Sequence, residues 1–354
     1  MLFANIGTGW TFVIIFALAY FFWDVTYGIN DIAYWTLLPA MSSDQKFREK
    51  TGAFARICAN VGMYIVMVGW QPVTSALGDT PKAWFWCAVV IAVIYLLGLL
   101  FPLLGVKEKR VAMENQESTS LKQMWIALTH NDQLMWTTLS MALFMVGYCT
   151  TVGFAVYYMK YIFGDEGLYV VLVGVCGVAQ LSALAVYPAF AGRFNRKQLY
   201  TLSTILVLAG YGIFFFAEIS IILIALGAVL VFVGQAFIQT LMLMFLADTV
   251  EYGQWKLGKR NESITFSVQP LINKIGGALS TAVVSLTLIL SGIKIDGGTV
   301  DAIDTAGKLL VKTSMFALPL VFIVAGYIIY LKKYKISETF YGEILHDLAE
   351  REKK

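Results

Sequence analysis

The amino-acid sequence predicts an all-α polytopic membrane protein. Of its 354 residues, 58% are hydrophobic and only 14% are charged, and the mean hydropathy is +0.71. Soluble domains are typically about 45–50% apolar and about 25% charged. A water-soluble fold cannot bury this much apolar surface, so we expect lipid to be the solvent for most of the chain.

Nine mostly apolar stretches are long enough to cross the bilayer, because a helix needs about 20 residues to span the hydrocarbon core. We expect helices because each one satisfies its own backbone hydrogen bonds in lipid. The alternating segments of about ten residues that mark a membrane β-barrel do not occur. The predicted spans are residues 10–41, 53–77, 83–105, 133–159, 168–190, 199–217, 219–247, 265–293 and 310–332.

The distribution of lysine and arginine predicts the orientation of these spans. Most of the 26 basic residues lie in the connections 42–52, 106–132, 191–198 and 248–264 and in the tail from 332. The alternate connections are short or carry few basic residues. Because basic loops stay on the cytoplasmic side, we expect these connections and the C-terminus to be cytoplasmic.

The long polar connection at residues 106–132 has three predicted spans before it and six after it. Two repeated six-helix halves joined by a long central loop are a common plan for large polytopic proteins. We therefore expect nine of twelve helices, with the first three missing from a truncated chain; a genuine nine-span protein is the alternative. The predicted domains are a partial N-terminal bundle (1–105), a central cytoplasmic loop with an amphipathic helix (106–132), a C-terminal six-helix bundle (133–333) and a cytoplasmic tail (334–354).

Several functional classes are disfavoured by the composition. A formal charge of +3 is too small to suggest a nucleic-acid partner. The four cysteines form no CxxC pair, and His130 and His346 lie in polar segments far from them, so we expect no metal site. The nucleotide-binding motif GxxxxGK[ST] and the hydrolase motifs GxSxG and HExxH are absent. We expect neither an ATP-driven pump nor a membrane-embedded enzyme.

Four ionisable residues stand out within the predicted spans: Asp24, Asp31, Arg56 and Lys274. A charge at the centre of a membrane helix costs about 2.5–3.5 kcal/mol on insertion scales, so such residues mark functional sites by default. Their positions therefore indicate where polar chemistry occurs inside the membrane.

The first span carries acidic and aromatic residues along one helical face: Asp24, Tyr27, Asp31 and Trp35. A carboxylate accepts hydrogen bonds from sugar hydroxyls, and an aromatic ring covers the apolar face of a pyranose. The stripe therefore predicts a sugar site. The alternatives are that the acids pair with basic residues between helices, and that Trp35 marks the membrane interface.

Arg56 and Lys274 are the candidate partners of these acids. Arg56 begins the second span, where it either extends to the interface or pairs with Asp31 or a sugar hydroxyl. Lys274 lies about ten residues into the span ITFSVQPLINKIGGALSTAVV, too deep for easy contact with water. A buried lysine needs a carboxylate partner or becomes neutral, so we expect it to pair with Asp31 or with an acid in the missing spans.

Two long motifs have a distinctive sequence: DIAYWTLLPAMSSDQKFREKTGAFARI and ADTVEYGQWKLGKRNESITFSVQPLINKIGGA. They resemble the fourth span and the region around the eleventh span of the glycoside-pentoside-hexuronide:cation symporters, a family of the major facilitator type. The segments TSLKQMWIALTHNDQLMW and GRFNRKQLY are similar to its central loop and a later linker. Within the family, the sequence is most similar to those of bacterial galactoside permeases, which are the lactose, raffinose and melibiose carriers.

The resemblance implies a major facilitator-like fold of two bundles and symport of a galactoside with H⁺ or Na⁺ by alternating access, with no cofactor beyond the coupling ion. It implies that Asp31 binds sugar and cation and that Trp35 stacks on the sugar. It also implies that Arg56 completes the sugar site and that Lys274 couples cation binding to sugar binding. Asp24 matches an acid of the galactoside branch.

The same resemblance implies partners and a location. We expect a small-molecule sugar, a monovalent cation and the lipid of the bacterial inner membrane as partners, and a monomer or homodimer. The family's first three spans hold much of its cation site, and by this resemblance they precede the start of this chain. The alternative function is therefore a non-transporting truncated remnant or membrane sensor of the same family.

Overall fold

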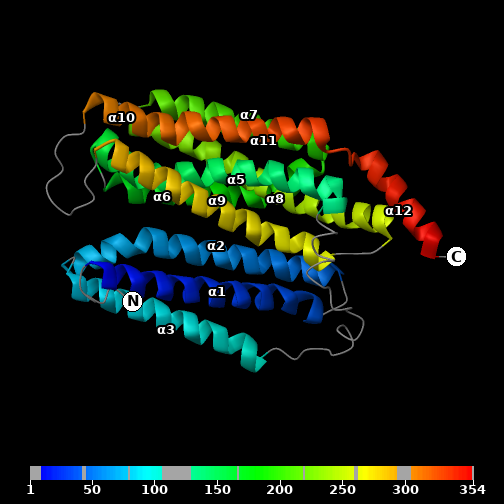
Figure 1. The fold of residues 1–354 in the computed structure, drawn as a ribbon, viewed down its shortest axis with the longest axis horizontal. Coiled ribbons are helices and arrows are strands. Elements are labelled where there is room, and N and C mark those ends of the chain that lie inside the picture. The colour runs from blue at the N-terminus through cyan, green and yellow to red at the C-terminus, as the bar shows by residue number, and fades with distance from the viewer. Residues whose placement is uncertain are drawn as a thin grey trace. The chain divides into compact units, whose positions relative to one another are not determined.

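A computed structural model describes residues 9–41, 45–78, 80–105, 129–165, 167–217, 220–258, 262–292 and 304–352 (Figure 1). Within these ranges, nine helical segments are long and apolar enough to cross a membrane. The prediction of an all-α polytopic membrane protein is therefore confirmed. The described chain divides into two compact units, residues 1–118 and 119–354.

Unit 1 contains three long helices: α1 (Trp10–Met41), α2 (Gln45–Ala76) and α3 (Pro81–Gly105). Helix α2 packs against both of the others, and the rings of Trp70 and Trp84 meet edge to face with centroids 5.6 Å apart. The Asn30 amide of α1 donates to the Tyr95 hydroxyl of α3 at 3.2 Å. Most apolar side chains of this unit are exposed, as expected where the solvent is lipid.

Unit 2 is built from more deeply buried helices, α5 to α11, which lie side by side in Figure 1. Two of them contain a wider π-helical turn. The elements are α5 (Asp132–Tyr158), η2 (Met159–Phe163), α6 (Leu168–Ala191), α7 (Arg196–Phe216), α8 (Ile221–Leu257), α9 (Glu262–Leu290), α10 (Thr305–Lys312), η3 (Thr313–Ala317), α11 (Leu318–Lys333) and α12 (Glu338–Glu352).

Glycines allow the helices of unit 2 to approach closely. A Cβ added to Gly210 of α7 would lie 2.7 Å from the Gly227 carbonyl oxygen of α8, and one added to Gly234 would lie 2.7 Å from the Ser203 carbonyl oxygen. Close approach of backbones through small residues is the usual way in which membrane helices gain packing energy. Gly276 of α9 has the same role, since a Cβ there would lie 3.1 Å from Met145 of α5.

The π-helical turn η3 connects its helix sideways to α5. The Met315 carbonyl accepts a hydrogen bond from the Thr151 hydroxyl at 3.0 Å, and the same hydroxyl lies 2.6 Å from the Tyr211 hydroxyl of α7. All three residues are buried. One polar contact in the bundle interior therefore joins α5, α7 and the α10–α11 helix.

The predicted seventh span ended at residue 247, but α8 continues to Leu257. The polar segment remains helical because Asp248 pairs with Arg196 and because Tyr252 packs against Ile336 and Ile344 of the tail. The helix ends at Gly258, whose φ of 74° favours glycine. The predicted amphipathic helix of the central loop falls mostly on residues 106–128, which lie outside the described residues.

Candidate functional site

The predicted acidic stripe lies on the second half of α1. Asp24 and Asp31 are half-buried and Tyr27 is exposed. Seven residues of helix separate the two acids along the axis by about 10 Å. The hydrogen bond between Asn30 and Tyr95 holds α1 against α3 beside Asp31. The side chain of Trp35 lies outside the described part of the chain.

The predicted basic partners belong to other helices. Arg56 lies in α2, and its side chain is likewise outside the described part. Lys274 lies in the middle of α9 and is exposed. Because Asp31 belongs to unit 1 and Lys274 to unit 2, their pairing stays a prediction.

Unit 2 contains a small cavity, and its lining residue Asn273 directly precedes Lys274 in the sequence. Its volume is about 60 Å³, enough for a few water molecules but less than a pyranose ring. It lies between α5, α8 and α9, and amide side chains supply its polar groups. The lining residues are Met141, Met145, Gln239, Met242, Leu246, Gln269, Ile272 and Asn273.

Two glutamines one turn apart on α8 have different roles. Gln235 is buried, and its amide oxygen accepts a hydrogen bond from Gln180 of α6 at 3.1 Å, so it joins two helices. Gln239 lines the cavity, and its amide donates to the Met145 sulfur at 3.8 Å. An amide can both donate to and accept from a hydroxyl, so Gln239 is suited to a sugar.

Gln269 and Asn273 line the cavity but were not predicted as site residues from the sequence. They are four residues apart on α9 and so share one face of the helix. Two amides at helical spacing within an apolar span, directly before Lys274, are the signal that could have identified them. Pro270 lies between them and cannot donate a backbone hydrogen bond, which leaves one carbonyl of the preceding turn without its helical partner.

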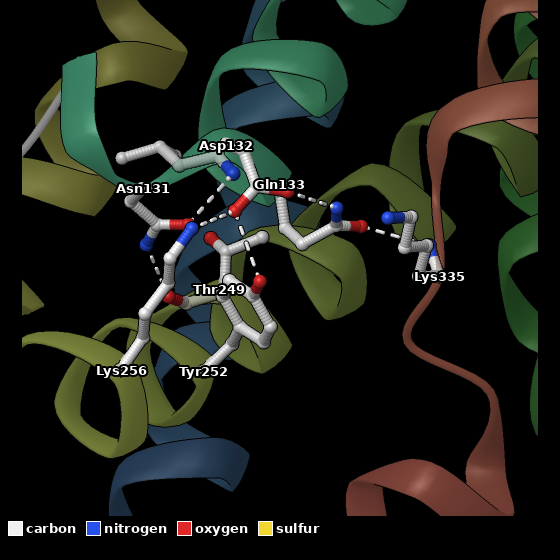
Figure 2. Close-up of polar contacts among 8 residues, drawn as sticks. Asn131, Asp132, Gln133, Thr249, Tyr252, Lys256 and Lys335 are labelled. Atoms are coloured by element: carbon white, nitrogen blue, oxygen red, sulfur yellow. Dashed lines mark hydrogen bonds and ion pairs between the residues drawn. The ribbon is translucent and has the colours of Figure 1, made fainter.

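A second polar cluster lies where α5 begins (Figure 2). Asp132 accepts hydrogen bonds from Tyr252 at 2.9 Å, from Lys256 at 2.5 Å and from Gln133 at 2.8 Å. The Gln133 amide oxygen accepts from the backbone N–H of Lys335 at 2.7 Å. These bonds connect the start of α5, the end of α8 and the segment after α11.

Asn131 caps the start of α5. The Asn131 side chain accepts from the backbone N–H of Leu134 at 3.0 Å and donates to the Thr249 carbonyl at 2.8 Å. A Cβ added to Gly253 would lie 2.8 Å from the Asn131 amide nitrogen. The cap therefore fits against α8 only because position 253 is glycine.

An ion pair near this cluster connects α7 to α8. The Arg196 guanidinium donates to the Asp248 carboxylate, which also accepts from the Tyr334 hydroxyl at 3.0 Å. Burial and the Asp248 carboxylate raise the pKa of Tyr334, so this hydroxyl keeps its proton and remains a donor. The end of α11 is thereby held against the start of α7.

Comparison with known sequences identifies the family. A sequence model described as MFS/sugar transport protein matches residues 1–338. The chain belongs to this family of sugar transporters. The match covers both units and confirms the resemblance that the two long motifs carry. Membership in the MFS/sugar transport family also agrees with the prediction that the chain is not an enzyme.

Relatives in the MFS/sugar transport family include permeases for galactosides. The chain is 34% identical to a lactose permease of Lactobacillus delbrueckii subsp. bulgaricus, over 95% of this chain and 55% of the relative. It is 32% identical to a raffinose carrier protein of Pediococcus pentosaceus, over 98% of this chain and 56% of the relative. The chain thus spans about half the length of these relatives.

Among solved structures, the chain is similar to a Major Facilitator Superfamily transporter, FucP, in the outward conformation. The identity is 15% and the TM-score is 0.47, covering 79% of this chain and 67% of that chain. Membership in the MFS/sugar transport family rests on the sequence match, which is the stronger finding.

Proposed function

We propose that this chain carries the sugar-binding part of a secondary transporter that moves a galactoside together with H⁺ or Na⁺. The observation that carries the proposal is the cavity in unit 2, where Gln239, Gln269 and Asn273 place amide groups at membrane depth. Amide groups are costly in an apolar span unless they find hydrogen-bond partners. The relatives named lactose permease and raffinose carrier support a galactoside as the substrate.

The cavity is too small for a whole sugar, so it would accept hydroxyl groups rather than a ring. The acidic stripe of α1 supplies the complementary chemistry: Asp31 and Asp24 accept hydroxyl hydrogens, and Tyr27 and Trp35 offer ring faces. Each group thus offers part of the chemistry of a sugar site: the cavity supplies amide donors and acceptors, and the stripe supplies acceptors and apolar cover.

We propose that Lys274 and Asp31 couple the cation to the sugar. A cation that neutralises Asp31 would weaken its attraction for Lys274, and this change of partner would bias alternating access between the two halves. Arg56, with its fixed fork of donors, would hold a sugar hydroxyl or Asp31. The coupling ion is the only small ion that this scheme requires, and no cofactor takes part.

We further propose an inner-membrane location with a cytoplasmic C-terminus. The basic connections of unit 2 gather at one end of the bundle. Arg196 pairs with Asp248, Lys256 pairs with Asp132, and the backbone N–H of Lys335 donates to Gln133. Such a concentration of basic residues on one side is what the positive-inside rule expects.

Counterflow in proteoliposomes tests the transport proposal. Proteoliposomes that contain the purified chain and are loaded with unlabelled lactose should accumulate labelled lactose transiently. Asp31→Asn should abolish sugar-dependent cation uptake, while Glu350→Gln, which neutralises an exposed acid of α12, should leave it unchanged. Absence of counterflow in the parent chain would instead favour a remnant or sensor. Normal cation uptake by Asp31→Asn would refute the role of Asp31.

A further inference from the structure

A group of exposed lysines lies where α7 begins and α11 ends: Lys197, Lys332, Lys333 and Lys335. The two helix ends are adjacent because Arg196 and Tyr334 both bond to Asp248. One turn further into the bundle, the Tyr327 hydroxyl donates to Thr201 at 2.7 Å. The lysines, which we call the basic cluster, therefore lie at one end of the same helix pair.

The carboxylates beside the basic cluster are already engaged. Asp248 accepts from Arg196 and Tyr334, and Glu338 accepts from the backbone N–H of Arg196 at 3.2 Å. Among the residues that the structure describes, no carboxylate forms an ion pair with Lys332 or Lys333. The cluster therefore retains positive charge that can attract an external anion.

An aromatic ring fixes one of these lysines at a defined place. The Lys333 ammonium lies 4.9 Å from the ring centroid of Trp136, a half-buried residue one turn into α5. Tryptophan is enriched at the level of lipid headgroups. The hydrogen bond from Lys335 N–H to Gln133 also fixes the chain after α11 to α5. The positive groups are thus held near the membrane interface.

The outer face of α11 continues from this cluster into the membrane. Helix α11 packs against α5 and α7, while Val321, Ile328 and Leu331 remain 63%, 42% and 40% exposed. Positions 321, 328 and 332 share one helical face. An apolar stripe therefore ends at a positive charge, which is the arrangement that an acyl chain joined to an anionic headgroup would fit.

We propose that the basic cluster and the outer stripe of α11 bind an anionic phospholipid. Its phosphate would contact Lys332, Lys333 and Lys197, and one acyl chain would lie along Val321, Ile328 and Leu331. The two features together select a lipid, because a water-soluble phosphate would use the lysines and leave the stripe uncovered. The site is separate from the residues proposed to bind sugar.

Native mass spectrometry of the full chain in detergent tests the proposal, with phosphatidylglycerol as the titrated lipid. The variant K332Q/K333Q should lose affinity for phosphatidylglycerol by tenfold or more, at roughly a few-fold to tenfold per lysine. Phosphatidylcholine should bind more weakly to the parent chain. The charge-preserving variant K332R/K333R should retain tight binding of phosphatidylglycerol.

The matched control removes two lysines from the other end of the same helical run. In K308Q/K312Q the loss of charge is equal, and Lys312 also lies over an aromatic ring, 4.6 Å from the centroid of Phe215. This control should bind phosphatidylglycerol normally. Four results would each overturn the proposal. The control could lose as much affinity as K332Q/K333Q, or phosphatidylcholine could bind as tightly as phosphatidylglycerol. K332R/K333R could lose phosphatidylglycerol binding, or glycerol phosphate could displace the lipid.

Discussion

The ion pair between Arg196 and Asp248 is asymmetric, and this asymmetry predicts how its variants rank in stability. The Asp248 side chain is 3% exposed, whereas that of Arg196 is 36% exposed. Arg196→Gln leaves a buried carboxylate with the Tyr334 hydroxyl as its charge-stabilising donor. Asp248→Asn leaves a guanidinium that still reaches water and still has an oxygen acceptor beside it.

The expected magnitudes follow from this difference in burial. Removing one partner of a buried pair costs about 3–5 kcal/mol, so Arg196→Gln should lower the free energy of unfolding by that amount. Asp248→Asn should cost about 1.5–3 kcal/mol, the range for a hydrogen bond to a charged group. The double variant removes both charges, so its cost should fall short of the sum by about 1–3 kcal/mol.

Denaturant titration of the four proteins in one detergent measures these differences. Arg193→Gln, which removes an exposed arginine three residues earlier, is the control and should stay within about 0.5 kcal/mol of the parent chain. The reasoning is refuted if Asp248→Asn costs as much as Arg196→Gln, or if the two costs simply add. Equal costs would mean that the carboxylate is not the more buried partner, and additive costs would mean that the two groups do not interact.

Three further predictions concern packing, the cavity and the tail. Gly210→Ala should destabilise unit 2 by about 1–3 kcal/mol because its Cβ would lie 2.7 Å from a backbone oxygen, while Gly212→Ala on the same helix meets nothing within 4 Å and should stabilise by about 0.4–1 kcal/mol in thermal unfolding. Gln239→Ala should weaken lactose counterflow about tenfold with little change in stability, whereas Gln235→Ala should mainly lower stability by about 1–3 kcal/mol, since it strands a buried amide. Trp255→Phe removes the indole N–H that donates to α12 at 3.0 Å and should speed proteolysis of the tail; an unchanged cleavage rate would contradict this.

The spans could be predicted because hydropathy depends on local sequence alone. Runs of apolar residues identified every described span. The end of α8 could not be found in this way. Its last ten residues are polar, and they stay helical because of Arg196 and the tail, which lie far away in the chain.

The candidate site was predicted less completely than the spans. Charged residues within a span indicate a functional site because they are costly in lipid, so Asp31 and Lys274 were predicted from the sequence. The neutral amides Gln269 and Asn273, which line the cavity, were not predicted. Only packing distinguishes a cavity amide from a helix-bonding one, as Gln239 and Gln235 show. The predicted pairing of Asp31 with Lys274 depends on the arrangement of two units, which no local pattern encodes.

The π-helical turn η3 has a consequence for the phase of its helix. An α-helix turns by about 100° per residue, and a π-helical turn holds one residue more than an α-helical turn. If the same residues rewound Thr313–Ala317 as a regular α-helix, everything beyond this turn would rotate by about 100° relative to what precedes it. Tyr327 would then point away from Thr201, and Tyr334 away from Asp248. The π-helical winding thus sets the direction in which the far end of this helix faces its neighbours, and a change of winding here would reorient side chains about five turns away.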